Sequence, residues 1–169
     1  MSEVRIRPAV AADVSVIREI TRPYVEQHIL VAKPPVAYYE GLQQFQVAEY
    51  DGQVVGCGAL HVFWEDLGEI RTLAVAEQAR GLGIGSALVD QLIASGRQLG
   101  LSRLFCLTFE VNFFSQHGFS PLYGNPVSPT VFAEMLRSYD EGVAEFLELD
   151  RVKPNTLGNI RMLLSLSAS

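Results

Sequence analysis

The stretch from Glu69 to Ser86 combines a carboxylate, an apolar segment and a glycine-rich loop. The apolar segment Leu73-Ala74-Val75 is followed by Arg80-Gly81-Leu82-Gly83-Ile84-Gly85, after which leucines recur at helical spacing. A strand that leads through glycines into a helix presents backbone N–H groups and the positive end of the helix dipole to an anion. Glycine is needed because a Cβ atom would keep phosphate oxygens away from the backbone. The pattern predicts a phosphate-binding loop.

Two common phosphate-binding patterns do not fit this loop. A dinucleotide fingerprint has glycine at its first, third and sixth positions, and the sixth position from Gly81 is Ser86. No Gly-Lys-Ser/Thr follows, which excludes a P-loop. The phosphate therefore belongs to another kind of ligand.

The elements around the loop follow from periodicity and turn signals. A first strand is expected over 4–7, and Asp13 is expected to cap the helix that follows it. Turns at Asp51-Gly52 and Asp66-Leu67-Gly68 separate strands over 45–50, 54–64 and 69–75. Ile84, Leu88, Leu92 and Leu99 mark the apolar face of the next helix. A strand over 104–109, helices over 113–118 and 128–138, an ambiguous stretch over 143–152 and a strand over 161–166 complete the chain, with Asp140-Glu141-Gly142 as a break.

The loop and its context resemble the GNAT acetyltransferase superfamily, whose pyrophosphate loop reads Arg-x-x-Gly-x-Gly. Phe114-Ser115-Gln116-His117-Gly118-Phe119 resembles the second acceptor and cofactor motif of that superfamily. The resemblance implies an α/β GNAT acyltransferase fold over residues 1–169 as a single domain, with a mixed, mostly antiparallel central sheet flanked by helices. It also implies acetyl-CoA as co-substrate. No metal is expected, because His28, His61 and His117 show no metal-ligand spacing. The implied cofactor-binding residues are Leu73, Ala74, Val75, Arg80, Gly81, Leu82, Gly83, Ile84, Gly85, Ser86, Asn112 and Phe114.

A narrower resemblance covers residues 55–60, 68–75, 104–108 and 153–159, which are similar to short, stand-alone bacterial N-acetylglutamate synthases. That family transfers the acetyl group of acetyl-CoA to the α-amino group of L-glutamate, at the start of arginine biosynthesis. The resemblance implies Glu69 as general base and a backbone N–H at Leu73 or Thr72 for the oxyanion. Relatives use a tyrosine as general acid where this chain has Phe114, so Ser115, Tyr123 or water remain as alternatives.

Glutamate carries two carboxylates, which require cationic or amide donors. By resemblance the substrate-binding residues are Val31, Lys33, Arg71, Thr72, Asn155, Asn159 and Arg161. Arg71 could equally form an ion pair with Glu69 or Glu49. Two alternatives to a glutamate acetyltransferase stay open: an acetyltransferase for another small amine such as glutamine, and a non-catalytic acyl-CoA-binding regulatory module.

Composition narrows the class of protein. The 169 residues are 49% hydrophobic with a net charge of −6, which favours a globular domain and argues against binding to nucleic acid. Six acids and one base between 132 and 150 give a local charge of −5, expected as a solvated helix face. Two cysteines in apolar runs are expected as reduced thiols, and the sequence contains neither a signal-peptide pattern nor a membrane span. A cytoplasmic protein is therefore expected, and an exposed strand edge near the C-terminus would allow a homodimer.

Overall fold

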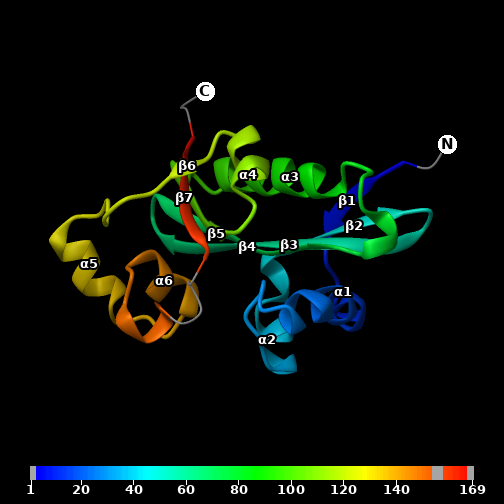
Figure 1. Cartoon of the computed structure of the whole chain (residues 1–169), viewed down its shortest axis with the longest axis horizontal. Helices are drawn as coiled ribbons and strands as arrows, with labels where there is room; N and C mark the ends of the chain where they lie inside the picture. The colour runs from blue at the N-terminus through cyan, green and yellow to red at the C-terminus, as the bar shows by residue number, and fades with distance from the viewer. Residues whose placement is uncertain (1–2, 154–157, 167–169) are drawn as a thin grey trace. The chain divides into compact units, whose positions relative to one another are not determined.

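The computed structural model describes residues 3–153 and 158–166 (Figure 1). They fall into two compact units. The first consists of residues up to 61 together with 70–99, and the second consists of residues 62–69 together with the chain from 100 onward. Asn155, one of the predicted substrate-binding residues, lies outside the described residues.

Within the described residues, the strands form one seven-stranded sheet in the order β1-β2-β3-β4-β5-β7-β6. The pairs β1–β2, β2–β3, β5–β7 and β6–β7 are antiparallel, whereas β4 and β5 run parallel. The predicted mixed, mostly antiparallel sheet is confirmed. The strands are β1 (Arg5–Pro8), β2 (Phe45–Tyr50), β3 (Gln53–Trp64), β4 (Leu67–Val75), β5 (Arg103–Thr108), β6 (Ser120–Pro121) and β7 (Ile160–Ser165).

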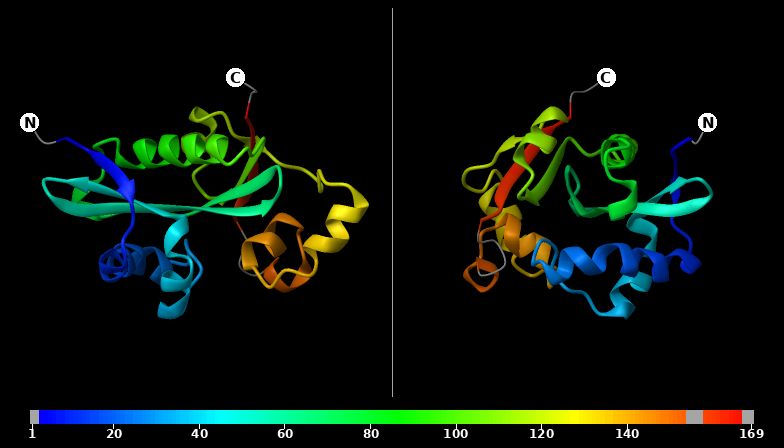
Figure 2. Two further views of the ribbon diagram at one scale, coloured as in Figure 1. Left: turned by 180° about the vertical axis from the view of Figure 1, so that it is seen from behind. Right: turned by 45° about the vertical axis from the view of Figure 1, so that its right-hand side comes forward.

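In the first unit, helices cover both faces of the strands. Helix α3 (Ile84–Gln98) lies on one face, and α1 (Val14–Glu26) and α2 (Pro35–Glu40) lie on the other (Figures 1 and 2). The two faces have separate apolar cores. Apolar residues of α1 and α2 pack against β2 and β3, and those at the start of α3 pack on the opposite side of the same strands.

Two glycines of β3 determine how closely α3 approaches the sheet. A Cβ atom at Gly56 would lie 3.0 Å from Ile84 Cγ2, and one at Gly58 would lie 2.9 Å from Leu92 Cδ1. Atoms in a close-packed core do not tolerate such short separations without moving. The absence of two side chains on the strand therefore allows the helix to lie where it does.

In the second unit, α4 (Val111–Gln116) lies on one side of β5, and α5 (Pro129–Met135) and α6 (Glu141–Phe146) lie on the other (Figures 1 and 2). The core of this unit is aromatic. The rings of Phe105 and Phe146 meet edge to face with their centroids 5.2 Å apart, an arrangement that aromatic pairs favour. Short 3-10 turns complete the two units at Ala11–Asp13, Leu42–Gln44, Glu77–Ala79 and Asp150–Val152.

Two predictions that rest on local sequence signals, the hairpin turn after β2 and the start of α5, are confirmed. Asp51 (φ 53°) and Gly52 (φ 73°) are both left-handed, as the hairpin turn between β2 and β3 requires. Ser128 Oγ accepts the N–H of Val131 at 3.3 Å, and Pro129 begins α5. Each of these predictions depended on residues within three positions of one another.

Two predictions about element boundaries are wrong. Leu67 and Gly68 belong to β4 rather than to a turn, because they pair with β5. Leu99 caps the end of α3 and is 60% exposed, so it is not part of the apolar face.

Two open points near the C-terminus are refined by the structure. Asp140 accepts the N–H of Val143 at 3.0 Å and thereby begins a helix over part of the ambiguous stretch. In the described part of the chain, β6 pairs with Met162 and Leu163 and so covers part of the β7 edge; the homodimer itself remains a prediction.

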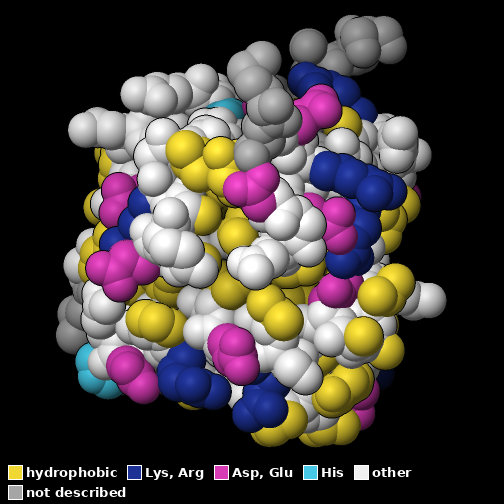
Figure 3. Space-filling model, turned by 90° about the vertical axis from the view of Figure 1, so that its right-hand side faces the viewer, with side chains coloured by type: hydrophobic (Ala, Val, Ile, Leu, Met, Phe, Trp, Pro, Cys, Tyr) yellow, Lys and Arg dark blue, Asp and Glu magenta, His cyan; other side chains and the backbone are white. Residues whose placement is uncertain are grey.

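Among the described residues, none of the helices has both the length and the apolar character that a membrane span requires, and His, Cys, Asp and Glu side chains do not gather in groups of three or more that could hold a metal ion. Cys57 and Cys106 are both buried and free, which agrees with the predicted thiols. On the face shown in Figure 3, basic and acidic side chains are interspersed with hydrophobic ones.

Asp13 differs from its predicted role as a cap. Its carboxylate does not cap α1. It accepts the N–H of Val10 at 2.7 Å and pairs with Arg7, whose Nη1 lies 2.7 Å from Oδ2. The hydrogen bonds from Arg7 hold the pKa of Asp13 below its ordinary value of 3.8, against the opposing effect of burial. The carboxylate therefore ties β1 to the start of α1 in its charged form.

Replacing this carboxylate tests that interpretation. Asp13→Asn is expected to lower the free energy of unfolding at neutral pH by about 1–3 kcal/mol, because the bonds to a charged partner are lost. A group whose folded-state pKa is depressed contributes its stability above the unfolded-state pKa and loses it as the pH falls through the folded-state pKa. Urea unfolding of both proteins from neutral to strongly acidic pH should show the difference shrinking in acid. A pH-independent difference would contradict this interpretation.

Candidate active site

Strand β4 contains a left-handed residue at its centre. Thr72 has φ 55°, a conformation that is unfavourable for a β-branched side chain. Two contacts hold it there: Lys33 Nζ donates to Thr72 Oγ1 at 2.7 Å, and Cys57 Sγ donates to the Thr72 carbonyl at 3.4 Å. Burial raises the pKa of Cys57 to about 12, so the thiol keeps the proton that it donates.

Lys33 comes from the loop between α1 and α2. Its ammonium lies 5.6 Å from the ring centroid of Tyr38 and 5.8 Å from that of Phe45, which are cation–π distances. Together with the bond to Thr72, these rings fix the position of the charge beside β4. The structure thus brings two predicted substrate-binding residues, Lys33 and Thr72, into direct contact. Val31 is exposed in the same loop, and Arg71 is half-buried on β4.

Glu69, the predicted general base, lies on β4 opposite Phe105 of β5 and is only 5% exposed. Burial raises the pKa of the neighbouring Cys106 thiol, and the negative charge of Glu69 adds to that increase. Glu69 is therefore not the solvent-exposed strand-end acid that its position after Gly68 could also have indicated.

The predicted phosphate loop has an open surface. Gly81 (φ 80°) and Gly83 (φ 77°) are left-handed, and a Cβ atom at either would meet no other atom within 4 Å. Helix α3 follows, and its first backbone bond runs from Ala87 N–H to Gly83 O at 3.1 Å. The amides of Ile84 and Gly85 come before Ala87, the first donor of the helical pattern, so they have no acceptor within the helix, as at every helix start. The space above the glycines and the dipole of a 15-residue helix together fit a phosphate group.

The predicted cofactor-binding residues occur in both units. Leu73–Val75 and residues 80–86 run without interruption from β4 into α3 in the first unit. Asn112 and Phe114 belong to α4 in the second unit, where Asn112 is exposed. Phe114 is 5% exposed and packs edge to face against Phe113 and Phe119, at centroid distances of 5.1 and 5.3 Å. The ring that replaces the general-acid tyrosine is thus a core residue.

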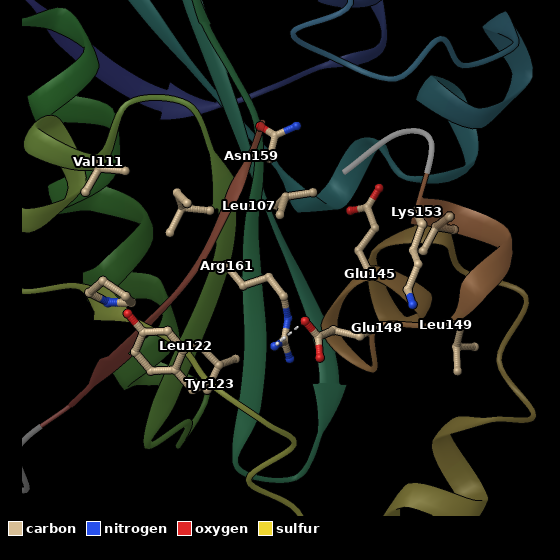
Figure 4. A pocket seen from close by; sticks show the side chains of 13 residues that line it. Leu107, Val111, Leu122, Tyr123, Glu145, Glu148, Leu149, Lys153, Asn159 and Arg161 are labelled. Atoms are coloured by element: carbon tan, nitrogen blue, oxygen red, sulfur yellow. Dashed lines mark ion pairs between the residues drawn. The ribbon is translucent and has the colours of Figure 1, made fainter. Parts of the chain in front are cut away.

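A pocket of about 610 Å³ opens in the second unit (Figure 4). Its walls come from β5, β6, α6 and β7, and they are apolar apart from a group of charged and polar side chains. Asn159 and Arg161, both predicted to bind substrate, lie in it together. The lining residues are Leu107, Val111, Pro121, Leu122, Tyr123, Glu145, Glu148, Leu149, Val152, Lys153, Asn159, Ile160 and Arg161.

Arg161 is held firmly within this pocket. Its Nη2 donates to the carbonyls of Gly124 and Phe146, and its Nη1 lies 3.3 Å from Glu148 Oε1 (Figure 4). Burial lowers the pKa of the guanidinium, whereas the charge of Glu148 opposes that change. The Nε donor is buried and has no hydrogen-bond partner among the residues that the structure describes. Within the described residues, the buried Nε–H of Arg161 is thus a donor that a further acceptor could use.

Glu145 and Glu148 were expected on a solvated helix face, and that expectation is wrong for Glu145, which is 6% exposed. Both residues line the pocket. The apolar residues on either side, Val143-Ala144 and Phe146-Leu147, were a signal of burial that the charge count concealed. Of the alternative general acids, Tyr123 lines the same pocket and is 86% exposed, and Ser115 is exposed on α4.

These features define a class of protein. A mixed sheet with a parallel β4–β5 pair, followed by an open glycine loop at the start of a long helix, is the framework of an acyl-CoA-dependent N-acyltransferase. The profile of the Acetyltransferase (GNAT) family matches residues 14–119, and the chain belongs to this family. The predicted fold and enzyme class, an acetyl-CoA-dependent N-acetyltransferase, are confirmed, and acetyl-CoA is its co-substrate.

Several relatives are similar over most of the chain. An amino-acid acetyltransferase from Mycobacterium tuberculosis is 54% identical over 95% of this chain and 94% of its own length. A crystal structure from the same species, in complex with CoA and NLQ, has a TM-score of 0.93 and 54% identity, covering 96% of this chain and 99% of that chain. The predicted resemblance to the short bacterial amino-acid N-acetyltransferases is thereby confirmed.

N-acetylglutamate synthase from Neisseria gonorrhoeae, complexed with coenzyme A and N-acetyl-glutamate, has a TM-score of 0.78 at 27% identity. The comparison covers 98% of this chain and 36% of that longer chain. An amino-acid acetyltransferase from Neisseria meningitidis is 38% identical over 69% of this chain, which corresponds to 27% of that protein. The chain therefore spans about a third or less of these longer relatives.

The contact at Thr72 yields a test. Thr72→Val keeps the β-branched shape of the side chain but removes the oxygen that accepts from Lys33. We expect the free energy of unfolding to fall by about 1–3 kcal/mol, since a partly buried ammonium loses its acceptor. Thr72→Ser, which retains the hydroxyl, is the matched control. Guanidinium unfolding of the three proteins measures the effect, and equal values for the valine and serine variants would contradict the role of the bond.

Proposed function

We propose that the enzyme transfers the acetyl group of acetyl-CoA to the α-amino group of L-glutamate, and that residues 1–169 act as one catalytic domain in arginine biosynthesis. The observation that carries this proposal is the 54% identity to an amino-acid acetyltransferase along nearly the whole of both chains. The likeness to an N-acetylglutamate synthase bound to N-acetyl-glutamate supports the particular acceptor. A cytoplasmic location is part of the proposal, which the two free, buried cysteines support.

Glu69 is assigned as the general base. Amines have ordinary pKa values of roughly 8 to 10, so most of the α-amino group is protonated at neutral pH and must lose a proton before it attacks the thioester. The carboxylate of Glu69 is buried on β4, and a base in such a site accepts that proton directly or through one water molecule. The amine is assigned to the carbonyls of Val31 and Thr72.

The backbone after Thr72 is assigned to the oxyanion. When the amine attacks, negative charge develops on the acetyl oxygen, and a fixed N–H group stabilises it more effectively than mobile water. A left-handed residue interrupts the regular alternation of a strand and redirects the next peptide group. The Leu73 N–H follows directly after Thr72 and is the assigned donor.

The two carboxylates of glutamate are assigned to cations that the protein already holds in place. Lys33 is fixed beside β4, and Arg161 has a buried Nε donor without a partner among the described residues. Arg71, Asn159 and Asn155 complete the proposed set, although Asn155 lies outside the described residues. The pyrophosphate of acetyl-CoA is assigned to the amides of residues 81–86, and its pantetheine to Leu73 and Val75.

The first experiment is thiol release from acetyl-CoA with a panel of free amino acids and simple amines. We expect L-glutamate to be the best acceptor by kcat/KM. A clear preference for glutamine or another amine would show that L-glutamate is not the acceptor, while acetyl transfer to an amine would stand. Binding of acetyl-CoA without turnover of any amine would overturn the proposed reaction in favour of a regulatory module.

The general base is tested by Glu69→Gln, which keeps the size of the side chain but removes its basicity. The expected result is a decrease of about 10²–10⁴-fold in kcat, because the step loses general-base catalysis. The Kd for acetyl-CoA should stay unchanged. Glu65→Gln, an exposed glutamate of the preceding turn, is the control. Unchanged kcat in Glu69→Gln would exclude this residue as the base.

A further inference from the structure

The side chain of Tyr24, in the last turn of α1, contacts two predicted cofactor-binding residues. Its hydroxyl donates to the carbonyl of Val75 at 2.7 Å, at the end of β4. The same oxygen accepts from Arg80 Nη2 at 3.2 Å, at the start of the phosphate loop. Tyr24 thus bridges the strand and the loop that are assigned to acetyl-CoA.

The ring of Tyr24 adds a second contact. The guanidinium carbon of Arg80 lies 5.5 Å from the ring centroid, which is a cation–π distance. A tyrosine hydroxyl has a single proton, and that proton is directed to Val75. Toward Arg80 the oxygen can therefore act only as an acceptor, which suits a cation. The two contacts define one orientation of an otherwise exposed arginine.

The backbone of Tyr24 is fixed independently of its side chain. Its carbonyl accepts the N–H groups of Ile29 at 2.8 Å and Leu30 at 3.2 Å, which closes the end of α1 after Pro23. These bonds remain when only the hydroxyl is removed. Substitution by phenylalanine therefore changes the contacts to Val75 and Arg80 and leaves the turn toward Lys33 in place.

The contacts with Tyr24 orient the Arg80 side chain before acetyl-CoA binds. This matters because ordering a flexible side chain on binding costs conformational entropy. An arginine side chain has many rotamers, and part of this freedom is lost whenever it binds a ligand. An arginine that is already oriented loses less on binding. A planar guanidinium in a fixed orientation is well suited to the oxygens of a pyrophosphate.

We propose that Tyr24 is a positioning residue for acetyl-CoA, which orients the Arg80 guanidinium toward the pyrophosphate through its hydroxyl and its ring. This inference rests on the proposed function, because that proposal assigns Arg80 to the cofactor. Tyr24 itself touches neither reacting group. Its effect is on the affinity for acetyl-CoA and not on the acceptor.

The test compares Tyr24→Phe with the unaltered protein by calorimetric titration of acetyl-CoA in the absence of any acceptor. We expect the Kd to rise about tenfold, which corresponds to ~1.4 kcal/mol. The KM for L-glutamate should stay the same. Tyr139→Phe, which removes the hydroxyl of a tyrosine that is 98% exposed, should bind acetyl-CoA normally. Equal affinity of Tyr24→Phe and the unaltered protein would overturn the proposal.

A double-mutant cycle with Arg80→Ala separates positioning from a general loss of structure. If Tyr24 acts through Arg80, adding Tyr24→Phe to Arg80→Ala should change the Kd by less than about twofold. A further tenfold loss in that background would overturn the proposal, because Tyr24 would then act by another route. Arg80→Lys gives a test that leaves Tyr24 intact: lysine keeps the charge but lacks the planar fork, so its affinity should also fall.

Acetyl-pantetheine, which lacks the pyrophosphate, gives a readout that an unspecific structural role would not produce. We expect Tyr24→Phe to leave the KM for acetyl-pantetheine unchanged, and an equal loss for both thioesters would contradict the role of Arg80. Failure of the Tyr24 proposal can be told apart from failure of the proposed function. An incorrect acceptor leaves the titrations of acetyl-CoA intact, whereas failure of the unaltered protein to bind acetyl-CoA would refute the proposed function itself.

Discussion

The left-handed conformation of Thr72 is the constraint on which the rest of the site depends. For an L-amino acid this conformation costs about 1–2 kcal/mol, and a β-branched side chain makes it less favourable still. The structure offsets that cost with contacts from two other elements, the ammonium of Lys33 and the thiol of Cys57. A loop far away in the sequence and a neighbouring strand therefore determine the course of β4 where the chemistry is assigned.

Lys33 and Arg161, the two cations assigned to the carboxylates of the acceptor substrate, share one property. Each is already held by contacts with other residues of the protein before any ligand binds. Lys33 lies on Thr72 and two aromatic rings, and Arg161 is bonded to two carbonyls and to Glu148. Burying a charge without partners is costly, so these contacts are what allow the cations to be placed in partly dry surroundings. They also reduce the conformational freedom that a bound carboxylate would otherwise remove.

Features of the site that are set by residues close together in the sequence could be predicted. Features that are set by contacts between residues far apart in the sequence could not. Gly81 and Gly83 have left-handed backbones, so the glycine-rich turn before α3 could be predicted from its spacing, and its role toward phosphate stays a prediction. The burial of Glu145 and the partners of Arg161 follow from how α6 packs against β7, which periodicity does not encode. Asp13 had the right residue type for a cap, but Arg7 on β1 takes its carboxylate instead. The assigned roles of Lys33 and Glu69 came from resemblance to a family, since a single lysine or glutamate carries no such signal.

The packing of α3 on β3 links the core to the ligand site. Gly56 lies beneath Ile84, the first residue of α3, and the backbone amides assigned to the pyrophosphate surround that residue. A methyl group added at Gly56 would lie 3.0 Å from Ile84 Cγ2 and 3.3 Å from the Ala74 carbonyl, so the first turn of α3 would have to shift. A buried strand position that is assigned no ligand contact thus constrains the loop proposed to bind the cofactor, which couples the evolutionary freedom of the core to that of the loop.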